Sequence, residues 1–164
     1  MEQGTGSTEQ GTRNTEQGTR NTQQGFRRLR AWQKADDLAC AVFQAVKRFH
    51  PEHVWLRSQI CRAAVSVPAN MAEGYTRGAL RDYLRFLDIA RGSLAETEYY
   101  IHFLRRNAVL PSDELDRLET LRAEVGSLLY ALTQSLREKV REDGPWQRGT
   151  LREEQFEYLS VMEE

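Results

Sequence analysis

Apolar residues recur at the spacing of an α-helix along four stretches of the chain, and polar residues fill the positions between them. The four stretches predict helices at residues 26–49, 54–74, 79–107 and 112–141. The connections between them are short, so consecutive helices are expected to lie antiparallel. The pattern therefore predicts an all-α protein built as an up-down four-helix bundle.

The second of these stretches is the most informative. Its apolar stripe is well defined and consists of Ile60, Ala63, Ala64, Val67, Met71 and Tyr75. Pro68 lies inside the pattern and has no N–H to donate, so we expect it to kink the helix or to end it there. Gly74 and Gly78 mark the expected exit into the third helix.

The length and composition fit a single domain. The chain has 164 residues, of which 40% are hydrophobic. It contains no apolar run long enough to span a membrane and no apolar signal-peptide core at its start. Cys40 and Cys61 are isolated from each other and from any metal-binding spacing. These features favour a cytoplasmic protein with two reduced thiols.

The two ends of the chain differ from the bundle domain at residues 26–141. Residues 1–25 hold repeats of the form EQGTRNT with no apolar position, which predicts a disordered leader rather than a coiled coil. Residues 142–164 form an acidic tail. The spacing of its apolar residues is compatible with a short amphipathic helix, and equally with a loose segment.

The formal net charge of −1 conceals a strong partition along the chain. Residues 1–25 carry 2 − 3 = −1, residues 26–141 carry 19 − 14 = +5, and residues 142–164 carry 2 − 7 = −5. Two interpretations are open. In the first, the bundle binds an anionic partner and the tail competes for the same surface. In the second, the charges are ordinary solvated side chains.

Basic residues cluster at predicted helix ends. Clustered Lys and Arg are what phosphate contacts require, although the signal is not specific. The residues expected to contact nucleic acid or another partner are Arg27, Arg28, Arg30, Lys34, Arg77, Arg81, Arg85, Arg105 and Arg106.

The third helix has more apolar surface than one bundle seam needs. Its additional residues are Phe86, Ile89, Tyr100 and Phe103. We expect them to form an oligomer interface, and the alternative is a slightly rotated core face. Another group of polar residues lies on or near the apolar stripes, and we expect its members to pair structurally between facing helices. That group is Arg62, Asn70, Glu73, Arg91 and Glu96.

The sequence contains little that points to catalysis. No His has a Glu three residues before it, as a di-metal bundle needs, and there is no phosphate-binding loop or nucleophile motif. The chain is therefore expected to be no enzyme and to hold no metal or cofactor. One weaker alternative is a ribonuclease of the HEPN type, because Arg48 and His53 have the Arg-x(4–6)-His spacing of that family.

Three blocks of the sequence resemble a known family. They are Trp32-x-x-Ala35, SQICRAAVSVPANMAEG at residues 58–74 and YLRFLDIARGSLAETE at residues 83–98. The chain resembles the bacterial four-helix-bundle proteins first found as products of intervening sequences in large-subunit ribosomal RNA genes. These proteins in turn are similar to the accessory variability protein of diversity-generating retroelements.

The resemblance implies a bundle that assembles as a ring-shaped homopentamer without catalytic residues. For the retroelement relatives it implies binding to a reverse transcriptase and to nucleic acid through basic surfaces. The function expected is therefore a non-enzymatic oligomeric adaptor that binds RNA, a reverse transcriptase or both. A self-assembling scaffold that binds no nucleic acid is a further alternative.

Overall fold

The computed structural model describes residues 25–142. In this part of the chain a short 3₁₀ turn, η1 (Phe26–Arg28), precedes helix α2 (Arg30–Ala45). Two more 3₁₀ turns, η2 (Val46–Arg48) and η3 (Pro51–His53), lead into α3 (Val54–Thr76), which is followed by α4 (Leu80–Arg106) and α5 (Ser112–Glu142). The predictions for the leader and for the acidic tail fall on residues 1–24 and 143–164, outside the described residues.

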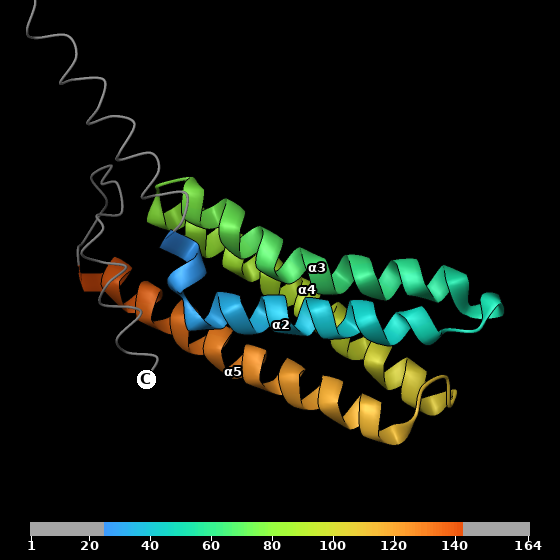
Figure 1. The fold of residues 1–164 in the computed structure, drawn as a ribbon. Coiled ribbons are helices and arrows are strands. Elements are labelled where there is room, and N and C mark those ends of the chain that lie inside the picture. The colour runs from blue at the N-terminus through green and yellow to red at the C-terminus, as the bar shows by residue number, and fades with distance from the viewer. Residues whose placement is uncertain (1–24, 143–164) are drawn as a thin grey trace, which may run out of the picture.

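The four long helices form an antiparallel up-down bundle (Figure 1). Each helix packs against the next one in the chain, and α5 closes the ring by packing against α2. The predicted bundle is thereby confirmed. The start of α2, the end of α3, the start of α4 and the end of α5 lie at one end, called here the proximal end (Figure 1). The opposite end, with the α2–α3 and α4–α5 connections, is the distal end.

One apolar core runs through the bundle. The predicted stripe of α3 is buried along its whole length, and its partners on the other helices include Leu38, Tyr83, Leu87 and Leu129, each less than 2% exposed. No helix among the described residues is both long enough and apolar enough to cross a membrane.

Of the two effects expected of Pro68, a kink or an end, the helix end does not occur, because α3 continues to Thr76. Pro68 is buried, and the indole Nε1 of Trp32 on α2 donates a hydrogen bond of 3.1 Å to its carbonyl oxygen. Two residues after Pro68, the Asn70 side chain donates a hydrogen bond of 2.7 Å to the Ser66 carbonyl. Burial against the neighbouring helices offsets the hydrogen bond that proline cannot make.

The first helix is shorter than its pattern suggests. Leu29 is extended (φ −72°, ψ 122°) and separates η1 from α2, while its side chain is buried in the core. At the other end α2 stops at Ala45, and the next three residues tighten into a 3₁₀ turn. The apolar stripe continues through both irregularities, because a 3₁₀ turn still places residues three apart on the same side.

Candidate nucleic-acid interface

A chain of aromatic contacts closes the proximal end. The ring of Phe26 lies 5.1 Å from that of Trp32 and 6.2 Å from that of Tyr75 at the end of α3, measured between centroids. Tyr75 in turn lies 6.0 Å from Tyr83 in the first turn of α4, and all these pairs meet edge to face. The contacts fix the three segments that carry the proximal arginines, because Arg27, Arg77 and Arg81 each lie within two residues of one of these rings.

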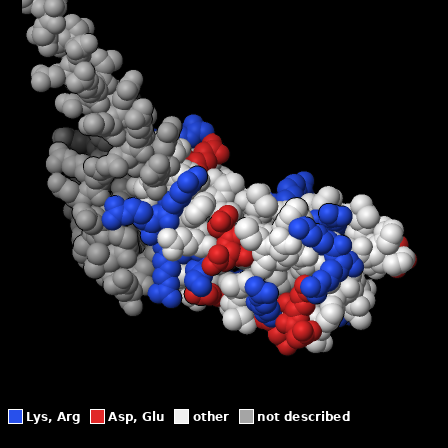
Figure 2. Space-filling view, viewed as in Figure 1, with Lys and Arg blue, Asp and Glu red and all other residues white. Residues whose placement is uncertain are grey.

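Seven of the nine predicted basic contact residues lie on the proximal part of the bundle. They come from η1, the start of α2, the C-cap of α3 and the start of α4, and are Arg27, Arg28, Arg30, Lys34, Arg77, Arg81 and Arg85. The last turn of α5 adds Lys139 and Arg141, which the sequence reasoning did not include in the surface. In Figure 2 Lys and Arg side chains gather on the visible face where α2 begins. An antiparallel up-down topology brings the start of α2, the end of α3, the start of α4 and the end of α5 to one end, so the predicted topology could have grouped all of these basic residues.

Several proximal cations already have partners. Glu124 of α5 lies 3.8 Å from Arg30 and 3.3 Å from Lys34, measured between nitrogen and oxygen. The Arg77 guanidinium bonds to Glu73 one turn earlier and lies 5.4 Å from the centre of the Phe86 ring. Contacts within the bundle therefore fix the positions of these cations.

Other proximal cations have no acidic partner among the side chains that the structure describes. No described carboxylate lies within 4 Å of the guanidinium groups of Arg27, Arg28, Arg81, Arg85 or Arg141. These side chains are also exposed. A bound anion would therefore meet them without breaking an internal ion pair, and we call these five arginines the open proximal arginines.

Arg105 and Arg106 lie at the distal end, far along the bundle from the other seven. Arg105 pairs with Asp116 of α5 at 2.7 Å and lies 3.9 Å from Glu119. Arg106 has no carboxylate partner in the described part of the chain. The structure thus divides the predicted basic set into a proximal group of seven and a distal pair.

Most of the predicted structural polar residues lie at the surface and pair weakly, whereas Asn70 is half-buried and bonds within α3. Arg62 of α3 approaches Glu96 of α4 at 3.8 Å, and their side chains are 68% and 43% exposed. Arg91 pairs within α4 with Asp88 at 3.3 Å, and Glu73 pairs within α3 as described above. Exposed pairs of this kind contribute about 0–1 kcal/mol each. Among these five residues, only the Arg62–Glu96 pair joins two helices, and it is not buried.

An apolar surface lies over α3 and α4. Of the predicted interface residues, Ile89 is exposed, whereas Phe86, Tyr100 and Phe103 are half-buried. Toward the distal end the rings of Trp55 and Tyr99 each lie 6.3 Å from that of Phe103. Trp55 and Tyr99 are 59% and 57% exposed, and the sequence reasoning missed both, since they lie at the margin of the apolar stripes. Partial burial raises the pKa of Tyr100, and the neighbouring Glu96 carboxylate raises it further.

Arg48 and His53 lie on two separate 3₁₀ turns. Arg48 belongs to η2 and pairs with Glu114 of α5 at 3.3 Å, while His53 belongs to η3 and lies 3.5 Å from Glu52. They therefore do not share one helix, whereas the ribonuclease motif requires the Arg and the His to lie on the same helix.

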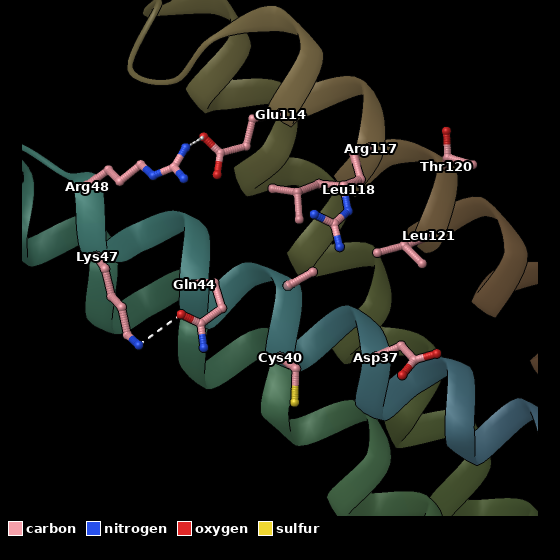
Figure 3. A pocket seen from close by; sticks show the side chains of 11 residues that line it. Asp37, Cys40, Gln44, Lys47, Arg48, Glu114, Arg117, Leu118, Thr120 and Leu121 are labelled. Atoms are coloured by element: carbon pink, nitrogen blue, oxygen red, sulfur yellow. Dashed lines mark hydrogen bonds and ion pairs between the residues drawn. The ribbon is translucent and has the colours of Figure 1, made fainter.

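A hollow of about 920 Å³ lies between α2 and α5. Figure 3 shows Arg48 turned to Glu114 at its edge, Lys47 turned to Gln44, and Arg117 extending toward α2. Arg48 lines this hollow, whereas His53 does not. Within residues 25–142 there is no group of three or more His, Cys, Asp or Glu placed to hold a metal ion.

Comparisons with known proteins agree with this architecture. The chain matches the family model of the 23S rRNA-intervening sequence protein over residues 27–131. No curated protein matches it. A crystal structure of a protein of unknown function from the S23 ribosomal protein family of Bacteroides thetaiotaomicron has the same fold, with a TM-score of 0.56 and 20% identity. The similarity covers 63% of this chain and 97% of that chain. The family match spans most of the bundle, so this chain belongs to the 23S rRNA-intervening sequence protein family.

Proposed function

We propose that this protein is a non-enzymatic, oligomeric adaptor that binds RNA through the proximal end of its bundle. The observation that carries the proposal is the set of five open proximal arginines, which have no acidic partners among the described side chains. Two of them, Arg27 and Arg81, lie within two residues of rings in the proximal aromatic cluster. Exposed cations on a fixed scaffold bind phosphates mainly by releasing counterions, which demands no particular base sequence.

The oligomer is the second part of the proposal. It is supported by the apolar surface over α3 and α4, which includes Ile89, Trp55 and Tyr99. Large exposed apolar side chains grouped on one surface are typical of protein contacts. Joining several protomers would repeat the proximal arginines and multiply their attraction for one long polyanion.

Fluorescence anisotropy with a labelled single-stranded RNA tests the RNA-binding role. The full chain is compared with Arg81→Ala/Arg85→Ala and with the distal double variant Arg105→Ala/Arg106→Ala, across a series of salt concentrations. We expect the proximal variant to bind more weakly and the salt slope of log K to fall by about 1.4, since each lost phosphate contact on a single strand removes about 0.7. The distal variant should retain both affinity and slope.

Absence of RNA binding by the full chain would contradict the proposal and favour a scaffold that binds no nucleic acid. Equal losses in the two double variants would show that the proximal end is not the binding surface.

A reverse transcriptase is the protein partner proposed for the same adaptor, as in the retroelement accessory proteins that the sequence resembles. Copurification with a reverse transcriptase encoded beside its gene tests this partner. The proximal double variant serves as the comparison there, because a transcriptase that binds through its RNA would be lost together with the RNA.

A further inference from the structure

The C-terminal part of the sequence, after the basic bundle domain, is acidic. The last twelve residues, 153–164, contain five carboxylates and no Lys or Arg, so their formal charge is 0 − 5 = −5. Over residues 143–164 as a whole the charge is 2 − 6 = −4. The bundle domain has the opposite sign, at 19 − 14 = +5.

Helix α5 ends at the proximal end, so this segment begins there. The helix runs to Glu142, where it extends past the start of α2 (Figure 1). Because α5 packs against both α2 and α4, the chain leaves the bundle between the two helices whose first turns carry Arg30 and Arg81. Arg141, the residue before the last in α5, is itself one of the open proximal arginines.

Chain length favours the proximal over the distal end. Glu153 follows Glu142 by eleven chain positions, which span at most about 36–40 Å when fully extended. Neighbouring helix axes lie about 8–10 Å apart, so the proximal arginines are within easy reach. The distal arginines lie about 40 Å away along the 27 residues of α4, so the first tail carboxylates reach them only at full extension.

We propose that the acidic segment at residues 143–164 docks on the open proximal arginines of its own bundle. Because the tether holds its carboxylates at an effective concentration in the millimolar range, docking requires no strong individual contact. Such a segment competes with an external polyanion for the same guanidinium groups. This competition rests on the proposed RNA-binding function, whereas the docking itself does not.

Carbodiimide cross-linking of the full chain tests the docking without RNA. The reagent joins a carboxylate to an amine in direct contact, and the chain has only three lysines: Lys34 and Lys139 near the proximal end and Lys47 near the distal end. At low salt we expect mass spectrometry to find the tail glutamates joined to Lys34 or Lys139 and not to Lys47. The yield should fall in about 0.5 M salt, where the Debye length shrinks toward a few ångströms.

Two charge-matched variants test the competition. Glu153→Gln/Glu154→Gln removes two tail charges, and Glu52→Gln/Asp113→Asn removes two charges at the distal end. Both change the formal net charge from −1 to +1. We expect the tail variant to bind single-stranded RNA about two- to tenfold more tightly than the unmodified chain at low salt, and the distal variant to change little.

The outcomes separate the two claims. Cross-links to Lys47 in equal yield, or none within the chain, would overturn the docking whether or not RNA binds. Proximal cross-links with no tightening of RNA binding would leave the docking standing and overturn the competition. Equal tightening in both variants would assign the effect to net charge alone.

Discussion

At Gly74 the backbone of α3 lies directly against two aromatic side chains of α4. A Cβ atom at this position would stand 2.5 Å from the Cβ of Phe86 and 2.9 Å from the Cδ2 of Tyr83. Neither neighbour can move away cheaply, because the first atom lies next to the α4 backbone and the second belongs to a buried ring. The absence of a side chain therefore sets how closely the two helices approach.

We predict that Gly74→Ala lowers the free energy of unfolding by about 1–3 kcal/mol, the usual cost of overpacking a close contact. Gly92→Ala is the matched control, since Gly92 is also inside a helix and nothing lies within 4 Å of its missing Cβ. The control should gain up to about 1 kcal/mol from the better helix propensity of alanine. Urea unfolding followed by circular dichroism measures both, and a stabilised Gly74→Ala would contradict the contact.

The two cysteines differ in their surroundings. Burial raises the pKa of the Cys61 thiol, and the charge of Arg57 only partly opposes this. Cys40 is exposed. The folded state favours the protonated thiol at position 61, and this preference adds to the free energy of unfolding. The added stability is complete below the pKa of the unfolded thiol. It is lost as the pH rises through the folded pKa.

We predict that iodoacetamide modifies Cys61 more slowly than Cys40 at pH 7.5, because Cys61 is the less exposed of the two and its raised pKa lowers the fraction of the reacting thiolate at that position. The rate at Cys61 should keep rising above pH 9, beyond the range in which an ordinary thiol has ionised. Peptide mass spectrometry resolves the two sites. A faster reaction at Cys61 than at Cys40 would be inconsistent with this environment.

At the scale of the helix, periodicity was sufficient to predict the elements but not their ends. The 3.6-residue pattern predicted the four long helices, and α4 and α5 differ from expectation by one residue at each altered boundary. Phe43 shows where the pattern failed. It belongs to the apolar stripe by spacing, yet it is 47% exposed and lies 4.9 Å below the Lys47 ammonium.

The effect of Pro68 was predicted less well, because it depends on contacts between helices. Proline propensity describes an isolated helix, whereas here α2 and α4 bury the segment and Trp32 bonds to the Pro68 carbonyl. The placement of the basic residues depends in the same way on topology, which is how Arg105 and Arg106 came to be grouped with residues at the other end. Ion pairs such as Arg105–Asp116 depend on the loop between α4 and α5 and leave no sequence signal.

The hydrogen bond from Trp32 on α2 to the Pro68 carbonyl on α3 can be tested by comparing substitutions of two tryptophans. We predict that Trp32→Phe lowers the free energy of unfolding by about 0.5–1.5 kcal/mol, because it removes the donor to Pro68 and keeps an aromatic ring. Trp55→Phe is the control, since this side chain is 59% exposed and should change stability by less than about 0.5 kcal/mol. Thermal unfolding of the two variants compares them, and equal effects would argue against a role for the hydrogen bond.

For the whole molecule, the apolar surface over α3 and α4 leads to a prediction about assembly. We expect size-exclusion chromatography with light scattering to give a mass near five protomers, as the family resemblance implies. Ile89→Lys/Tyr99→Lys should reduce the mass, because charges would enter the contact. Phe43→Lys, at an exposed position on α2, should leave it unchanged, and the reverse result would place the contact on the α2 surface.

The proximal arginines also limit how a polyanion approaches one protomer. They lie at the end of a bundle about 20 Å wide, so a strand bound there in the proposed role would cross only a short stretch of protein surface. Duplex nucleic acid carries one charge per about 1.7 Å of its axis, so such a footprint covers on the order of ten phosphates, and only those facing the protein are in contact. In the proposed RNA-binding role, a single protomer would therefore hold a strand weakly and exchange it readily. Tight retention of a long strand then depends on how many such ends an assembly presents side by side.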